Sequence, residues 1–314
     1  MPATEVDSPA LRERAARFLA GMRGRGRRQP NPPQPALEPP AQAQAGVAHV
    51  WELGHFYSPV PDTRELAREP GRSRVWPEHP RETPGLDWRG EEQLRLLHAL
   101  AEQPPLAGHH RPNPNFSALD AWVLQGMLRH LGPRRVVEVG CGFSSLVTAH
   151  VNRECFGGAV DVTCIEPYPP DFLTGGVDGI GRLIPSPVQD VPLETFAALE
   201  ARDVLFIDTS HVIKTGNDVQ FLYQEVVPRL RAGVLVHIHD IFLPREYPPD
   251  WVLGGRAWNE QYLVESFLAF NGAFEVMLGV GWLCTFHRDA VADAAGDAEP
   301  GGGGSLWIRR RDAG

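Results

Sequence analysis

Short apolar runs alternate with longer amphipathic stretches from residue 134 to the end of the chain. Each run is long enough for a strand, and several of the stretches between them carry apolar residues at helical spacing. Strands that alternate with helices are typical of a parallel, doubly wound sheet. We therefore predict an α/β fold with a Rossmann-like, seven-stranded sheet. The strands are expected near residues 134–139, 160–165, 182–187, 203–207, 233–238, 273–279 and 305–310.

The same pattern predicts several helices outside these runs. Residues 91–102 carry leucines at helical spacing, and residues 118–131 predict a second helix with Ser117 as its N-cap. Residues 258–270 predict a helix before the sixth strand. Residues 289–304 are rich in Ala, Asp and Gly, so we expect a flexible insertion there.

A glycine turn follows the first predicted strand. The apolar run ends in Glu-x-Gly-x-Gly, which places Glu138, Gly140 and Gly142 in the turn, and helical spacing resumes over residues 144–152. Gly140 and Gly142 lack a Cβ, so they can adopt positive φ and let a ligand lie against the backbone. The strand, tight turn and helix together predict a nucleotide-binding turn.

The turn differs from two common phosphate motifs. A dinucleotide fingerprint needs a third glycine where Ser145 stands, and a phosphate loop needs a Gly-Lys-Ser/Thr sequence that is absent. The N–H groups of Ser144 and Ser145 open the helix and suit a polar or anionic group of the ligand. With Glu138 two residues before the first glycine, the turn resembles the first motif of the class I S-adenosylmethionine-dependent methyltransferases, Glu/Asp-x-Gly-x-Gly. That resemblance implies that Glu138 lies near the methionine end of the cofactor.

Candidate residues for the rest of this cofactor follow the next two strands. Glu166 comes directly after the second strand, more than 20 positions beyond the turn, where an acidic side chain can accept hydrogen bonds from both hydroxyls of a ribose. The resemblance implies the same role. Gln189 and Asp190 follow the third strand, where the family often places a contact to adenine.

The fourth and fifth strands also end in polar residues. Asp208 follows the fourth strand, and His239 and Asp240 follow the fifth. In the family's strand order these strands are neighbours, so the three side chains are expected to converge and to suit a divalent cation. This resembles the metal-dependent O-methyltransferases of the catechol and macrolide-sugar kinds, which hold Mg²⁺ there. The pair is usually acidic in them, and the imidazole of His239 shifts the preference toward Mn²⁺, Fe²⁺ or Zn²⁺. An acidic edge without metal is the alternative.

Two nearby residues are candidates for removing a proton from the acceptor. His211 lies three positions beyond Asp208, a spacing at which the macrolide-sugar enzymes place a histidine base. A histidine of near-neutral pKa can accept a proton as the acceptor attacks the methyl group. Lys214 is the second candidate, and His237 is expected to be a core histidine.

Three regions are expected along the chain. Residues 1–47 include a stretch rich in Pro, Ala and Gln, which favours a flexible tail and linker. Residues 48–133 are expected to form a helical cover, and covers of this kind often close over substrate. Residues 134–314 contain the predicted sheet and are expected to form the cofactor-binding domain.

Charge and composition narrow the classes of partner. Acidic residues number 39 against 30 lysines and arginines, which gives a net charge of −9 at neutral pH. This excess argues against nucleic acid as a partner. The four cysteines form no Cys-x-x-Cys pair and are expected to be reduced. No apolar run approaches the ~20 residues that a membrane span needs, so we expect a soluble, cytoplasmic protein, with a homo-oligomer left open.

The resemblance implies an enzyme that transfers a methyl group from S-adenosylmethionine to a hydroxyl of a small molecule, a sugar or a secondary metabolite, assisted by a metal. Methylation of an amine without a metal is an alternative. A second alternative is a non-heme iron oxygenase that uses His211 and His239 with Asp208 or Asp240, since two imidazoles and one carboxylate suit that chemistry. A third is a non-catalytic protein that binds the cofactor as a regulatory ligand.

Overall fold

The computed structural model describes residues 54–296 and 302–312, apart from residues 56, 105, 107, 109–112 and 114. Trp51–Gly314 form one compact unit. The predicted tail over residues 1–47 lies outside the described residues. The boundary predicted after residue 133 lies inside the compact unit and stays a prediction. No helix in the described part of the chain is long and apolar enough to cross a membrane.

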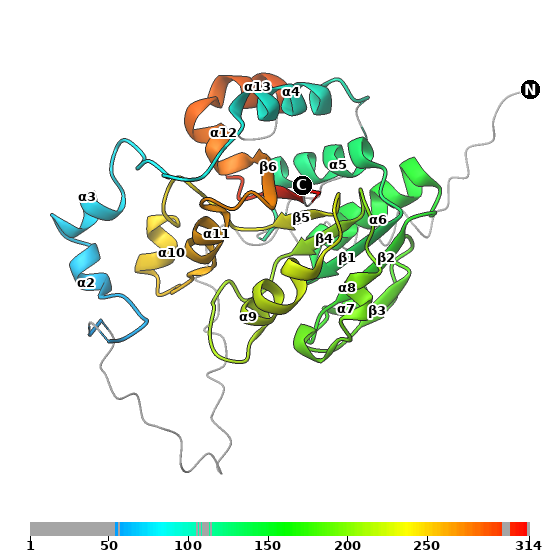
Figure 1. Cartoon of the computed structure of the whole chain (residues 1–314), viewed down its shortest axis with the longest axis horizontal. Helices are drawn as coiled ribbons and strands as arrows, with labels where there is room; N and C mark the ends of the chain where they lie inside the picture. The colour runs from blue at the N-terminus through cyan, green and yellow to red at the C-terminus, as the bar shows by residue number, and fades with distance from the viewer. Residues whose placement is uncertain are drawn as a thin grey trace, which may run out of the picture. The chain divides into compact units, whose positions relative to one another are not determined.

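Within the described residues, seven strands form one sheet in the order β3-β2-β1-β4-β5-β7-β6 (Figure 1). The first five strands in the chain are parallel, and β7 is antiparallel to both of its neighbours. All seven predicted strands are therefore confirmed, and β3 is shorter than expected. The strands are β1 Arg135–Val139, β2 Asp161–Ile165, β3 Arg182–Ile184, β4 Val204–Ile207, β5 Leu235–Ile238, β6 Phe274–Gly279 and β7 Leu306–Arg310.

The four central parallel strands end at the same level. Val139 at the end of β1 lies opposite Ile165 of β2 and Ile207 of β4, and Ile207 lies opposite Ile238 of β5. In a doubly wound sheet, ligands bind beyond the carboxyl ends of the strands. This edge receives the glycine turn and each candidate residue that directly follows β2, β4 or β5.

The helices cover both faces of this sheet, and most predicted helices are confirmed. Ser117 caps α5 as expected, because its side chain accepts a hydrogen bond from the backbone N–H of Asp120. Before the sheet lie α2 Thr63–Leu66, α3 Gly71–Val75, α4 Gly90–Ala101 and α5 Ala118–Leu131. Between the strands lie α6 Phe143–Phe156, α7 Asp171–Thr174, η1 Val188–Asp190, α8 Glu194–Ala197, α9 Asp218–Phe221 with its continuations η2 Leu222–Val226 and η3 Val227–Arg229, α10 Pro249–Leu253, α11 Glu260–Leu268, α12 Val280–Phe286 and α13 Arg288–Ala295.

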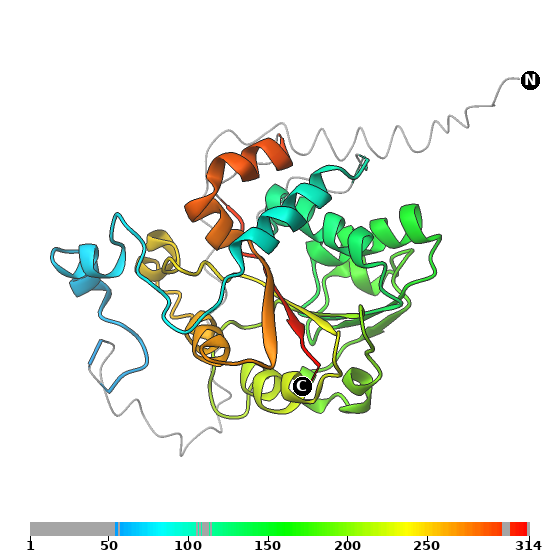
Figure 2. The same ribbon diagram turned by 45° about the horizontal axis from the view of Figure 1, so that its top comes forward.

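One prediction for this part of the chain is wrong. Residues 289–304 were expected to be a flexible insertion, but α13 occupies its first half and packs beside α4 (Figure 2). The alanines of this segment favour a helix, and Val291 gives the helix an apolar anchor that is only 2% exposed. Residues 297–301 lie outside the described part.

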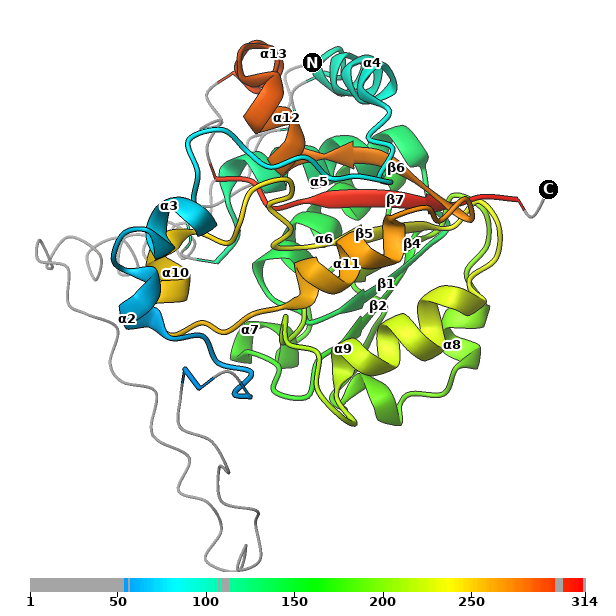
Figure 3. The ribbon, with the colours of Figure 1, turned by 60° about the vertical axis from the view of Figure 1, so that its left-hand side comes forward.

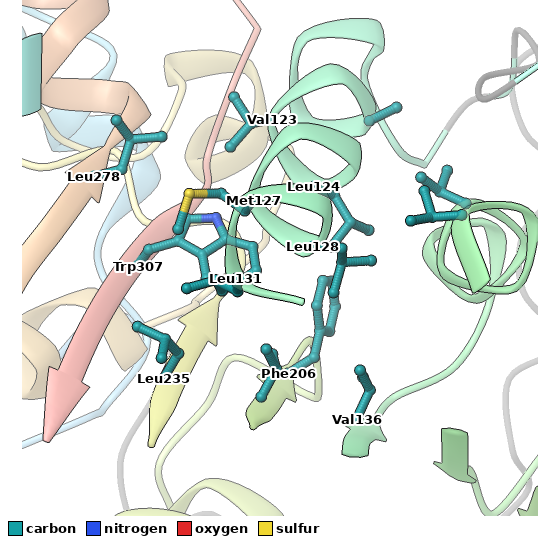
Figure 4. Close-up of a cluster of buried hydrophobic side chains, with 14 of the residues drawn as sticks. Val123, Leu124, Met127, Leu128, Leu131, Val136, Phe206, Leu235, Leu278 and Trp307 are labelled. Atoms are coloured by element: carbon teal, nitrogen blue, oxygen red, sulfur yellow. The ribbon is translucent and has the colours of Figure 1, made fainter. Parts of the chain in front are cut away.

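The hydrophobic core lies on both faces of the sheet. On one face, Val136, Phe206 and Leu235 pack with Leu124 and Met127 of α5 (Figure 4). Helix α5, which lies within the predicted cover, is therefore part of the core. Burial of one such side chain contributes about 2 kcal/mol.

The alternate residues of the same strands face the other layer of helices. Val137, Leu205 and Val236 belong to a second cluster, together with Leu222 of η2 and Val264 of α11. This period of two is what a strand buried on both faces requires. The two clusters hold the carboxyl edge of the sheet rigidly, which fixes the side chains that follow the strands.

Candidate functional site

The two glycines of the turn have different surroundings. Gly140 has a φ of +83°, and a Cβ built on it would lie 1.6 Å from the carbonyl oxygen of Asp208. Its N–H donates to the carbonyl of Ile165 at 2.9 Å. Gly140 adopts the positive φ that was predicted and is required by close packing between strand ends, while its contact with a ligand stays a prediction. A Cβ on Gly142 would meet nothing within 4 Å, so the open space beside the turn lies there.

Glu138 is buried directly behind the turn. Its Oε1 accepts hydrogen bonds from the hydroxyls of Ser144 at 2.6 Å and Ser145 at 2.8 Å. Its Oε2 is buried and has no hydrogen-bond partner among the described residues. Burial raises the pKa of Glu138 to about 7, although the two serine hydroxyls oppose that shift. A buried carboxylate oxygen without a partner fits a ligand that brings a hydrogen-bond donor or a positive charge.

Glu166 lies against the same turn. Its Oε2 accepts a hydrogen bond from the backbone N–H of Cys141 at 3.2 Å, and its Oε1 accepts one from Tyr168 at 2.8 Å. The structure therefore brings Glu166 beside the glycine turn. Gln189 and Asp190 are exposed in η1, where the Gln189 amide donates to the carbonyl of Gly216 at 3.4 Å. No described contact joins these two residues to the turn.

Asp208, His211 and Asp240 form what we call the acid–imidazole cluster. The Nε2 atom of His211 lies 3.2 Å from Oδ1 of Asp208 and 3.5 Å from Oδ2 of Asp240. One ligand atom from each residue lies within 4.8 Å of the others. Two carboxylates and one imidazole this close fit a divalent cation. The histidine of this cluster is His211, whereas His239 was the predicted ligand.

The other side of the His211 ring contacts a carboxylate that the sequence analysis missed. Nδ1 of His211 lies 2.9 Å from Oε2 of Glu260, and the Tyr223 hydroxyl donates to the other oxygen of Glu260 at 2.9 Å. Glu260 is fully buried at the start of α11. A glutamate in the first turn of a helix is favoured by the helix dipole, so its position alone did not indicate a second role.

These contacts set the charge of the cluster. Burial alone would lower the pKa of His211, but its hydrogen bonds to Asp208 and Glu260 outweigh burial and raise the pKa to about 10. Burial raises the pKa of Asp240, and it also opposes the lowering of the Asp208 pKa by the positive charges of His239 and His211.

His239 lies beside the cluster and faces a cavity of about 910 Å³. Its Nε2 is 3.8 Å from Oδ1 of Asp240, and its Nδ1 is 3.4 Å from Nε2 of His237. His237 is buried in the core as predicted. Lys214, the other candidate base, is exposed and does not line the cavity.

The cavity is lined by segments far apart in the sequence. They are the end of α3 and the residues after it, the residues before α5 with its first turn, the segment from β5 to α10, α12 with the start of α13, and the residues before β7. Figure 3 shows α3 and α10 on the same side of the sheet edge. The aromatic walls of the cavity are Trp76, Phe116, Phe242 and Trp251. Asp240 belongs both to the acid–imidazole cluster and to the wall of the cavity.

Comparison with known proteins places this fold in a class. Residues 137–241 match a family described as a methyltransferase domain. An uncharacterized protein from Archaeoglobus fulgidus is 35% identical over 169 residues, which are 49% of this chain and 76% of that protein. The chain belongs to the family of this archaeal protein. Together with the strand order, the domain match identifies the chain as a class I methyltransferase, an enzyme.

Two solved structures show a low similarity to the chain. PaMTH1, an SAH-bound methyltransferase from Podospora anserina, is 16% identical with a TM-score of 0.40, over 71% of this chain and 88% of that one. A DUF574 family protein from Streptomyces avermitilis is 15% identical with a TM-score of 0.38, over 62% and 82%. Similarity at this level carries no argument about the chemistry of the present site.

The iron-oxygenase alternative needs a different donor set. That chemistry uses two imidazoles and one carboxylate. The donor atoms that come together here belong to one imidazole, that of His211, and to the two carboxylates of Asp208 and Asp240. The described geometry therefore does not favour the alternative.

Proposed function

We propose that the protein transfers a methyl group from S-adenosylmethionine to a hydroxyl group of a small molecule, with the help of a divalent cation. The observation that carries the proposal is the position of Asp240. This residue joins the acid–imidazole cluster to the cavity, at the sheet edge that also carries the glycine turn. Cofactor, cation and acceptor would therefore meet at one point.

The residues around the turn fit S-adenosylmethionine. The cofactor carries a positively charged amino group, and the unpartnered Oε2 of Glu138 would accept a hydrogen bond from it. Glu166 would accept hydrogen bonds from the ribose hydroxyls, and the space beside Gly142 would admit the ligand. Gln189 and Asp190 stay candidates for contact with the adenine. The bound cofactor supplies a methyl group that is already electrophilic.

Asp208, Asp240 and His211 would hold the cation. Glu260 would keep the Nε2 atom of His211 turned toward the two aspartates, as carboxylates commonly do for metal-bound histidines. A cation at this position acts as a Lewis acid that lowers the pKa of the acceptor hydroxyl. The mixed donor set suits Mn²⁺ or Fe²⁺ as well as Mg²⁺.

In this proposal the two histidines exchange their predicted roles. His239 faces the cavity and, in its neutral form, would accept the proton of the acceptor hydroxyl, whereas a neutral His211 would be a ligand. Burial lowers the pKa of His239, but the negative charges of Asp208 and Asp240 outweigh burial and raise it, so proton transfer to His239 is favoured. A hydrogen bond from Nδ1 of His239 to His237 would leave the lone pair of His239 on Nε2. The aromatic walls exclude water and orient the acceptor.

The test is calorimetric titration of S-adenosylmethionine into metal-stripped protein, repeated with Mn²⁺ and Mg²⁺, and followed by methyl transfer to a library of small hydroxylated compounds. We expect cofactor binding without metal, and separate metal binding. Asp208→Asn should abolish metal binding and lower kcat/KM on the order of 10³-fold while it preserves cofactor affinity. Asp178→Asn, an exposed carboxylate, is the matched control.

Each outcome of this test has a distinct meaning. Absence of cofactor binding would contradict the methyltransferase proposal. Transfer that proceeds equally well without metal, and in Asp208→Asn, would contradict the metal-assisted form. Products methylated on nitrogen alone would replace the hydroxyl acceptor by an amine.

A further inference from the structure

The cavity has an excess of arginine in a protein that is acidic overall. Arg74, Arg81, Arg245 and Arg288 line it, whereas the whole chain has a net charge of −9. An acidic protein repels anions at long range, so a local group of arginines has to be explained by what it contacts. A charged group in the lining is available to a ligand only where other residues of the protein do not already bind it.

Most of these charged groups have protein partners. Those partners hold each charge in an ion pair or in hydrogen bonds. The pairs are Arg74 with Glu65, Arg81 with Glu265, Asp120 with Ser117 and Ser305, and Glu246 with Gln261 and Tyr262.

Arg245 and Arg288, which we call the arginine pair, are different. Arg245 uses only its Nε atom, which donates to the hydroxyl of Thr285 at 3.3 Å, so both terminal nitrogens are without a described partner. Arg288 has no hydrogen bond or ion pair with any described residue. Both arginines line the same cavity, Arg245 from the segment between β5 and α10 and Arg288 as the first residue of α13.

A guanidinium with unpaired terminal nitrogens presents a fork of donors that matches the oxygens of a carboxylate or a phosphate. Asp240 and His239 offer the complementary chemistry, a carboxylate and an imidazole, to a hydroxyl group. Between these polar groups lie aromatic walls that include Phe242 and Trp251. The cavity thus suits a ligand with a hydroxyl, an apolar body and an anionic group.

We propose that the methyl acceptor carries an anionic oxygen group, a carboxylate or a phosphate, which Arg245 and Arg288 bind. This inference rests on the proposed function because it takes the bound ligand to be the methyl acceptor. Binding of an anion by the two arginines does not itself depend on methyl transfer. Binding at two fixed points orients the hydroxyl toward Asp240 and His239. Neutral compounds of the same shape bind less tightly, because they leave the two arginines without a partner.

The experiment is titration of the full-length protein with inorganic phosphate and, separately, with benzoate, at constant ionic strength. Intrinsic tryptophan fluorescence reports binding, because Trp76 and Trp251 line the cavity. The test variants are Arg245→Gln/Arg288→Gln and the single Arg288→Gln. The control is Arg229→Gln/Arg231→Gln, which makes the same change of charge at arginines that do not line the cavity.

We expect saturable binding of at least one anion to the wild type and the control, and affinity 10- to 100-fold lower in the double variant. Binding of phosphate alone identifies a phosphorylated acceptor, and binding of benzoate alone a carboxylate. Absence of binding by both anions, or equal affinity in all proteins, overturns the inference. Cofactor binding by the same samples is measured separately, so failure of the proposed function is distinguishable from failure of the anion site.

Discussion

The glycine turn and the cavity lie at the same edge of the sheet but are built in opposite ways. The turn and its partners Glu138, Ser144 and Ser145 come from one stretch of eight residues, in which both serine hydroxyls donate to the carboxylate of Glu138. The cavity is assembled from segments between residues 74 and 303. A site made from one stretch can be found as a motif, whereas a site assembled from many segments becomes visible only in the folded chain.

Among the variants considered, substitution of the two glycines of the turn should have the largest effect on stability, and it tests whether the turn is held by local packing. Gly140→Ala should destabilise the fold by about 4 kcal/mol or more, because its Cβ would collide with the backbone of Asp208 at a positive φ. Gly142→Ala should leave stability nearly unchanged and should weaken cofactor binding, since its Cβ would enter open space. Chemical denaturation and calorimetric titration of both variants provide the measurements. Equal stability of the two would show that the turn is not held by packing between strand ends.

The strands and the residues that directly follow them were predictable because their signals are local. An apolar run of strand length followed by Glu166 or Asp208 places those side chains at the sheet edge whatever the rest of the chain does. Glu260 was not predictable, since it lies 49 residues from its partner His211 and its position depends on the packing of α11. The roles of the two histidines after β4 and β5 also depended on which ring faces the cavity, and sequence spacing does not contain that information.

The buried carboxylate of Glu138 predicts a pH effect on stability. Its pKa rises from 4.5 to about 7 on folding because of burial, so the unfolded chain loses this proton at lower pH than the folded protein does. Stability therefore falls as pH rises from about 4.5 to 7, by about 3 kcal/mol, and this loss is constant at higher pH. Glu138→Gln should remove this component.

Urea denaturation of the wild type and Glu138→Gln between pH 4 and 8 measures the difference. Glu194→Gln, an exposed carboxylate on α8, is the control. Saturating S-adenosylmethionine should reduce the wild-type effect, because a donor that pairs with Oε2 of Glu138 stabilises the ionised form. Parallel pH curves for wild type and Glu138→Gln would contradict the assignment.

The smallest effect concerns the link between α11 and the acid–imidazole cluster. Glu260→Gln keeps the shape of the side chain but removes the negative charge that faces Nδ1 of His211. If Glu260 positions His211 as a ligand, affinity for Mn²⁺ should fall 10- to 100-fold, with a matching fall in kcat/KM. Affinity for S-adenosylmethionine should stay the same, because the glycine turn does not contact Glu260 in the described structure.

Glu265→Gln is the matched control, since it lies on the same helix and pairs with Arg81 at the surface. Addition of Mn²⁺ in excess should restore activity to Glu260→Gln, because a positioning defect weakens binding of the cation without removing a ligand. A variant that loses cofactor and cation affinity together, or that excess Mn²⁺ does not restore, would mean that Glu260 supports the fold rather than the orientation of His211. Restoration by Mn²⁺ would instead show that cation binding by the acid–imidazole cluster depends on the contact between Glu260 and His211, two residues far apart in the chain.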